Sequence, residues 1–296
     1  MRWFLNLCSG LDRLGVAYRV NDYRGLRRHP GTWAHVVGKP QVVEKIPLGH
    51  PIIYGPGIAS HPYDNDFWGR ANIRLMLVSC DWFKAMCDRD LPCPVPTAVW
   101  PAGIDTDLWK PPRTEAPSTA HRSTDFLIYD KVRWEHDRYE GELIQPIWDE
   151  LQRRNLSFVT VRYGFYQEKE FHSALQRCRA MIFLCEHETQ GFAYLQALSS
   201  GVPIFAWDRG GLWKDPDMYP HRVQFAPVTS VPYFDSRCGM RFEDLARFQK
   251  VLPQFWDGVV KKRFAPRSYV VENFDLAGQA RKYLELSDAT QKASKP

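Results

Sequence analysis

The chain has 296 residues, of which 44% are hydrophobic and 25% charged, as in an ordinary globular protein of one large or two modest domains. A net charge of +5 is well short of a nucleic-acid footprint, so nucleic acid is not an expected partner. No apolar run approaches the roughly 20 residues of a membrane-spanning helix. The seven cysteines lack zinc-site spacing, and no signal-peptide pattern is visible, which favours free thiols and a cytoplasmic location.

Residues 1–110 alternate between helical spacing and short apolar segments. A helix is expected at 3–14, and another at 82–86. β-branched segments bounded by Gly, Pro and polar residues predict strands at 16–20, 34–37, 51–54, 74–78 and 95–99. Such alternation indicates a parallel sheet with helices on both faces.

A polar, proline-rich stretch at 111–124 predicts a linker between domains. A second alternating series follows in 125–275. Strands are expected at 126–129, 158–161, 181–185 and 203–207, and helices at 143–153, 168–178 and from Phe192 to the stop at Gly201. Asp275 is a candidate N-cap for a helix over 276–287, and the polar tail 288–296 is predicted to be disordered.

The most informative stretch is 186–203, where a buried strand ends in an acidic loop that opens a helix. In such βαβ units, ligands bind at the carboxyl ends of the strands, near the helix N-terminus. Gly191 would let the backbone approach an anion closely. The N–H groups of Gln190, Gly191, Phe192 and Ala193 are therefore candidates for holding a phosphate or diphosphate.

This stretch resembles the donor-binding signature of retaining GT-B glycosyltransferases. That signature has a Glu, seven residues, a second Glu and a small residue–Gly–x–Pro ending. Glu188 matches the first Glu, whereas Gln196 stands at the second position. The segment 101–109 resembles the end of the family's N-terminal domain, and Gly210-Gly211 resembles a short loop after the next strand.

The resemblance covers roughly residues 50–285 and implies an α/β chain of two Rossmann-like domains facing across a cleft. They would be an acceptor-side domain at 1–110 and a nucleotide-sugar domain at 125–275, with the helix 276–287 crossing back to the first. The family opens with a strand and a Gly-rich loop, whereas this chain opens directly into the helix 3–14. The resemblance therefore also implies a shortened N-terminal domain.

By the resemblance, Glu188 would orient the transferred sugar; otherwise its carboxylate is a favourable group at a helix N-terminus. Gln196 would contact the ribose hydroxyls, with one acceptor oxygen and an NH2 group in place of two acceptor oxygens. Lys131, after the strand 126–129, would bind the diphosphate, and Arg133 and Arg138 are alternatives.

Two further positions have weaker support. Ser230 lies in a turn-rich insert, 229–239, that either binds phosphate or base or is a structural loop. His61 follows a strand on the acceptor side and loosely matches a family histidine near the reacting sugar; it could equally be a packed residue.

No divalent metal is expected to be required, because the three Asp-x-Asp pairs at 64–66, 105–107 and 215–217 are uninformative against a background of acidic loops. The implied reaction moves a sugar from a nucleoside-diphosphate donor to a glycan or lipid-linked acceptor with retention. An epimerase of the same fold and a non-catalytic pseudo-glycosyltransferase remain open. The basic clusters at 24–29 and 261–263 are either solvated faces or contacts with the anionic inner face of the membrane.

Overall fold

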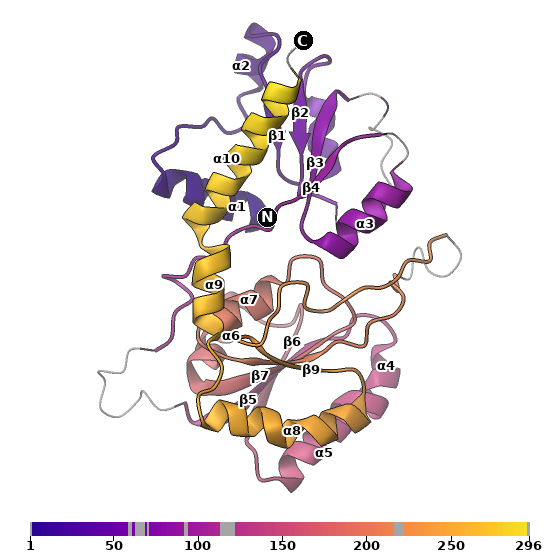
Figure 1. Ribbon diagram of the computed structural model, residues 1–296, viewed down its shortest axis with the longest axis vertical. Helices are drawn as coiled ribbons and strands as arrows, with labels where there is room; N and C mark the ends of the chain where they lie inside the picture. Colours follow the sequence, from indigo (N-terminus) through magenta and orange to yellow (C-terminus); the bar gives the residue numbers. More distant parts are fainter. Residues whose placement is uncertain are drawn as a thin grey trace. The chain divides into compact units, whose positions relative to one another are not determined.

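The computed structural model describes residues 2–58, 61–62, 69, 71–91, 94–112, 122–215 and 222–294. The chain divides into two compact units (Figure 1). Met1–Gly103 and Phe274–Pro296 form the first unit, and Ile104–Asn273 form the second. Each unit is an α/β layer structure with a parallel sheet, so the predicted fold class of two Rossmann-like domains is confirmed.

The first unit contains a four-stranded parallel sheet of order β1-β2-β3-β4. Four of the five strands predicted for this region are confirmed. The strands are β1 (Ala34–Val36), β2 (Ile52–Tyr54), β3 (Ile73–Val78) and β4 (Thr97–Val99). The helices are α1 (Arg2–Arg13), α2 (Tyr23–Arg28), the 3-10 helix η1 (Pro40–Lys45), α3 (Asp81–Asp90) and α10 (Leu276–Ala293).

The predicted strand at 16–20 is wrong, because this segment pairs with no strand among the described residues. The Val16 N–H instead donates to the Leu11 carbonyl at the end of α1, and the Tyr18 hydroxyl donates to Asp12. Val20 is 49% exposed. A β-branched pattern forms a strand only where a neighbouring strand supplies hydrogen bonds.

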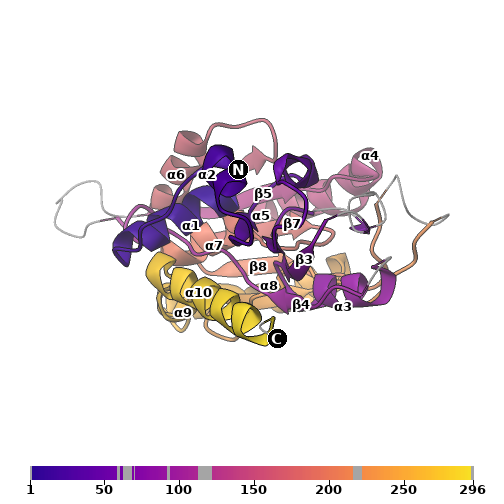
Figure 2. The ribbon, with the colours of Figure 1, turned by 90° about the horizontal axis from the view of Figure 1, so that it is seen from above.

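Helices α1 and α10 run side by side (Figures 1 and 2). A Cβ atom on Gly10 would lie 2.3 Å from the Leu276 carbonyl oxygen, so glycine permits this close approach. Asp275 caps α10 by accepting from the Gly278 N–H. The prediction of disorder from residue 288 is wrong, because α10 continues to Ala293. The polar residues of this last turn and a half form an exposed helix surface.

The second unit contains a five-stranded parallel sheet of order β6-β5-β7-β8-β9. The strands are β5 (Thr124–Lys131), β6 (Phe158–Arg162), β7 (Cys178–Cys185), β8 (Ile204–Trp207) and β9 (Gly239–Phe242). The helices are α4 (His136–Tyr139), the π-helix η4 (Glu140–Ile144), α5 (Gln145–Arg153), α6 (Glu168–Arg177), α7 (Phe192–Ser199), α8 (Leu245–Val260) and α9 (Pro266–Phe274).

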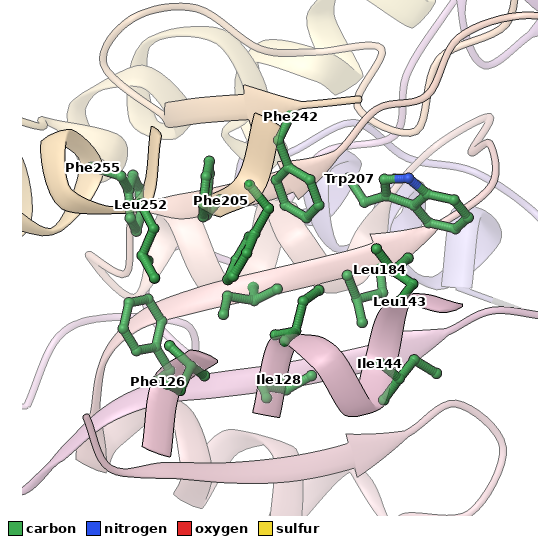
Figure 3. Packing of buried hydrophobic residues seen from close by; sticks show 14 of the residues in the cluster. Phe126, Ile128, Leu143, Ile144, Leu184, Phe205, Trp207, Phe242, Leu252 and Phe255 are labelled. Atoms are coloured by element: carbon green, nitrogen blue, oxygen red, sulfur yellow. The ribbon is translucent and has the colours of Figure 1, made fainter. Parts of the chain in front are cut away.

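Successive side chains of the central strands pack alternately against the two layers of helices. Phe126 and Ile128 of β5 join a cluster with residues of α5 and α8, as Figure 3 shows. Tyr129 points to the other layer, where its ring stacks on Phe183 at 5.7 Å and meets Phe171 of α6. Helices therefore cover both faces of the sheet, and polar groups are left to the edges where its strands begin and end.

The predicted unit of strand, loop, helix and strand at 181–207 is confirmed as β7, α7 and β8. Helix α6 ends one residue earlier than predicted, because Cys178 already pairs with Thr124 in the sheet.

Candidate functional site

Three neighbouring strands of the second unit end at the same edge of the sheet. In the ladders, Lys131 of β5 pairs with Cys185 of β7, and Leu184 pairs with Trp207 of β8. The residues that follow β7 and β8 include Glu186, His187, Glu188, Asp208 and Arg209. Charged groups from three separate segments therefore converge at the carboxyl edge, the usual ligand position in an open parallel sheet.

Lys131 and Glu188 form an ion pair at this edge, with the ammonium donating to the carboxylate. Each side chain is only 14% exposed. Burial alone would lower the pKa of Lys131, but the Glu188 carboxylate raises that pKa above its usual range. Burial alone would raise the pKa of Glu188, but Lys131 lowers it. Both groups are therefore charged at neutral pH.

Glu186 lies directly after β7 and is 2% exposed. Its Oε1 accepts hydrogen bonds from the backbone N–H groups of Arg133 and Trp134, at 2.8 and 2.9 Å. Its Oε2 is buried and has no hydrogen-bond partner among the described residues. Burial raises the pKa of Glu186 despite these two donors. Glu186 thus fixes the loop that directly follows Lys131, the last residue of β5.

The loop into α7 turns at Gly191, which has a φ of +72°. A Cβ atom here would lie 1.9 Å from Cε1 of Tyr194, whose ring is fully buried. Both the backbone conformation and the space require glycine. The first-turn residues Phe192 and Ala193 are half-buried, and Gln190 is 2% exposed. The N-terminal turn of α7, rich in backbone donors, therefore follows three residues after Glu188.

Gln196 lies in the middle of α7 and is 6% exposed. Within the described part of the chain, its side-chain amide makes no hydrogen bond to protein. A ligand hydroxyl that reached this amide would give it a hydrogen-bond partner.

His187 lies between Glu186 and Glu188 in an aromatic cluster. Its ring stacks on Trp134 at 5.1 Å, and Trp213 lies 6.2 Å away. Its Nε2 lies 3.2 Å from the Lys214 carbonyl, which fixes Nε2 as the protonated nitrogen of the neutral ring. Burial lowers the pKa of His187 to about 4.

The structure brings Lys131, Glu188 and the 190–193 turn to one edge, whereas the side chains of the other two predicted cations have partners of their own. The Arg133 guanidinium lies over the Trp134 ring at 4.7 Å. Arg138 is 53% exposed on α4 and pairs with Glu142 at 3.0 Å. Its charge therefore belongs to a surface pair four residues apart.

Ser230 is fully buried, and its hydroxyl donates to the Trp207 carbonyl at 2.8 Å. Its backbone N–H donates to Asp208, which also accepts from the Thr229 hydroxyl. Of the two alternatives for the 229–239 insert, this geometry favours a structural loop that is held against the end of β8.

His61 belongs to the first unit, is fully buried, and lies 2.7 Å from the Asp90 carboxylate. This contact gives His61 a partner in α3, as expected of a packed histidine. The Asp105 carboxylate accepts from the N–H groups of Asp107 and Leu108, which makes the 105–107 pair an Asx turn. Residues 64–66 lie outside the described residues, as do Pro216 and Asp217 of the third Asp-x-Asp sequence.

Sequence reasoning missed Arg209, which follows β8. Its Nη2 donates to the Leu212 carbonyl, and its Nε is buried without a partner among the described residues. Its positive charge acts on Glu186 and His187. The available signal was its position, two residues after the strand at 203–207 and just before Gly210-Gly211.

Two searches of the described residues bear on cofactors and membranes. His136, Asp137 and Glu140 place ligand-type atoms within 4.8 Å of one another where α4 passes into η4, but His136 already contacts Asp130. In the same part of the chain, every helix is too short or too polar to cross a bilayer.

No family profile matches the chain, and no curated protein matches it in sequence. Solved structures match the chain in fold. Sucrose-phosphate synthase from Thermosynechococcus elongatus matches with a TM-score of 0.57 at 13% identity, over 92% of this chain and 76% of that one. TarM matches with a TM-score of 0.56 at 11% identity, over 85% of this chain and 54% of that one. The chain thus spans about half the length of TarM.

WaaG, a glycosyltransferase involved in lipopolysaccharide biosynthesis, matches with a TM-score of 0.51 at 11% identity, over 96% of this chain and 95% of that one. These neighbours are GT-B glycosyltransferases. The chain therefore has the GT-B fold, with one parallel sheet of four strands and one of five. The fold predicted from the 186–203 stretch is confirmed.

Proposed function

We propose that this protein is a glycosyltransferase that moves a sugar from a nucleoside-diphosphate donor to a glycan or lipid-linked acceptor. The observation that carries the proposal is the Lys131–Glu188 pair, held at the carboxyl edge three residues before the αL turn at Gly191. A cation, a carboxylate and a helix N-terminus together offer groups for a diphosphate and for sugar hydroxyls.

In this proposal, Lys131 exchanges its carboxylate partner for a phosphate oxygen of the donor, and the N–H groups of 190–193 hold the same diphosphate. The Arg209 guanidinium stabilises the negative charge that develops as the nucleoside diphosphate leaves. Glu188, once released, accepts hydrogen bonds from the sugar and stabilises positive charge at its anomeric carbon. Gln196 contacts the ribose.

The proposed stereochemistry is retention. The bond between the anomeric carbon and the phosphate oxygen breaks, and the acceptor oxygen bonds to that carbon from the same face. The acceptor proton passes to the leaving phosphate oxygen, so no metal is required in this scheme. His61 has no step in it, since its ring is buried against Asp90.

A lipid-linked acceptor would bring the protein to a membrane surface, and α2 supports that part of the proposal. Arg24, Arg27 and Arg28 are all exposed on this short helix. Clustered cations of this kind attract anionic headgroups, each contributing about 1 kcal/mol.

A thermal-shift panel of UDP, GDP, ADP and CMP with their common sugars tests donor binding. Ligand at about a hundred times its dissociation constant adds about 2.7 kcal/mol to the native state. A shift with one nucleotide that is lost in Lys131→Gln supports the site. Incubating the donor alone separates an epimerase from a transferase, and no shift with any nucleotide would favour a non-catalytic protein.

A further inference from the structure

A pocket lies in the second unit, at the edge of its sheet opposite to Lys131 and Glu188. It has a volume of about 730 Å³, within the range of small-molecule sites. Arg122 precedes β5, Arg179 is the second residue of β7, and Pro203 precedes β8; all three line the pocket. Because the strands are parallel, these residues mark the amino edge. The eight residues of β5 separate this edge from Lys131 by about 25 Å.

The described residues that line this pocket carry charge of one sign. Four cationic side chains line it, and none of the described lining residues is acidic. The cationic residues are Arg122, Arg179, Lys262 and Arg267.

Two of the three guanidinium groups have no carboxylate partner in the described part of the chain. Arg122 donates only to the carbonyls of Ser200 and Gly201, at 2.6 and 3.2 Å. Arg267 donates only to backbone carbonyls, among them that of Ser199 at 2.9 Å. The carbonyls of Ser199, Ser200 and Gly201 lie at the end of α7, and their partial negative charges offset only part of two full positive charges. Burial lowers the pKa of Arg122.

Lys262 links this pocket to the basic cluster at 261–263. Its two neighbours share one carboxylate, since Lys261 and Arg263 both pair with Asp257. Lys262 instead has a φ of +52°, and its side chain lines the pocket. Arg179 is 36% exposed, pairs with Asp125 at 3.3 Å and lies over the Trp256 ring.

We propose that this amino-edge pocket is an anion site that binds a phosphate-bearing ligand, separate from the carboxyl-edge site. Uncompensated guanidinium groups match phosphate oxygens, and an exposed lysine at the rim adds a mobile charge. The volume exceeds that of a single phosphate, so the ligand class is a phosphorylated small molecule or a phospholipid headgroup.

The test uses the full chain and titrates inorganic pyrophosphate by calorimetry. Lys262→Glu reverses the charge at the rim without touching the carbonyl-capping arginines, and both residues accept the same backbone conformation. We expect binding at this site to weaken by at least about tenfold, equivalent to about 1.4 kcal/mol. Lys131→Gln should leave the site intact, which separates it from the proposed donor site.

Lys250→Glu is the matched control, because Lys250 is an exposed lysine of α8 that does not line the pocket. Equal weakening in both variants, or wild-type binding in Lys262→Glu, would overturn the proposal. A second arm measures sedimentation with phosphatidylcholine vesicles that carry phosphatidylglycerol. If Lys262→Glu loses vesicle binding, the phosphate belongs to a lipid headgroup. If Lys262→Glu loses pyrophosphate binding and keeps vesicle binding, the ligand is a soluble phosphate compound. Failure of both probes to bind would also overturn it.

Discussion

Lys131 and Glu188 lie 57 positions apart in the sequence, yet the Lys131 ammonium donates directly to the Glu188 carboxylate. The contact follows from topology, because β5 and β7 are adjacent parallel strands that end at the same level. Each group keeps the other charged. The pair therefore sets a cation beside a carboxylate where, in the proposed function, a donor diphosphate would enter.

Replacing Glu188 with Gln should uncouple this pair. The amide keeps the shape but leaves the Lys131 charge, 14% exposed, without its counter-charge. We expect a loss of about 3 kcal/mol in the free energy of unfolding, measured in urea. In the proposed function, turnover should also fall by about a hundredfold.

The double variant Lys131→Met/Glu188→Leu serves as the control for that change. An apolar pair of similar volume removes both charges, so stability should recover while turnover does not. Recovery of turnover in the double variant would contradict the proposed role of the pair.

The stability of the protein should depend on His187 between pH 6.5 and 4. The pKa of His187 is lowered to about 4, so the unfolded chain takes up a proton in this window and the folded chain does not. Stability is therefore complete above about pH 6.5 and falls as the pH falls toward 4. His187→Gln keeps a donor for the Lys214 carbonyl but cannot titrate. Melting curves at pH 7 and 4.5 should show a smaller drop for this variant than for the wild type.

Gly191→Ala should destabilise the second unit. The new Cβ would meet Tyr194 at 1.9 Å, and the backbone would keep a φ of +72°. Tyr194 cannot yield easily, because its ring is buried and its hydroxyl accepts from the Tyr233 N–H. We expect a loss of about 3 kcal/mol in urea unfolding. Gly141→Ala is the control, since no atom lies within 4 Å of that added Cβ, and its effect should stay below about 1 kcal/mol.

The sequence predicted the elements whose signals are local. Three local signals predicted β7, the end of α7 and β8: an apolar run, the glycine at 201 and a second apolar run. The order of strand, loop, helix and strand at 181–207 was therefore predicted correctly. Strand β9, by contrast, falls at the end of the turn-rich insert. It is held by pairing with β8, through contacts such as that of Phe205 with Met240, which no local pattern reveals.

The site was predictable where one segment carried it and not where several segments meet. Lys131 was predicted because it lies just past the apolar run 126–129. Arg209 was missed because its importance depends on β8 lying beside β7, which brings its charge to Glu186. Arg138, by contrast, pairs with Glu142 four residues on, a spacing that the sequence itself shows.

Charge reversal on α2 should weaken membrane binding. Arg27→Glu/Arg28→Glu changes two exposed cations to anions. Binding to vesicles that contain phosphatidylglycerol should fall by more than about tenfold in a sedimentation assay. The matched control is Lys169→Glu/Lys250→Glu, which makes the same change of charge at two exposed lysines of the second unit. Equal losses in both variants would mean that only net charge matters.

Gln196→Glu tests whether the buried amide of α7 faces the nucleotide. In the free protein, a carboxylate at this 6% exposed position would lack the hydrogen bonds that it needs, so the variant should melt at a lower temperature than the wild type. If Gln196 contacts the ribose, two acceptor oxygens should bind its hydroxyls more strongly by about 1 kcal/mol, or about fivefold in affinity. Nucleotide should therefore raise the melting temperature of Gln196→Glu by more than that of the wild type. Gln196→Leu should melt at least as high as the wild type and respond less to nucleotide. An identical nucleotide response in all three proteins would place Gln196 in the packing of α7 rather than in the site.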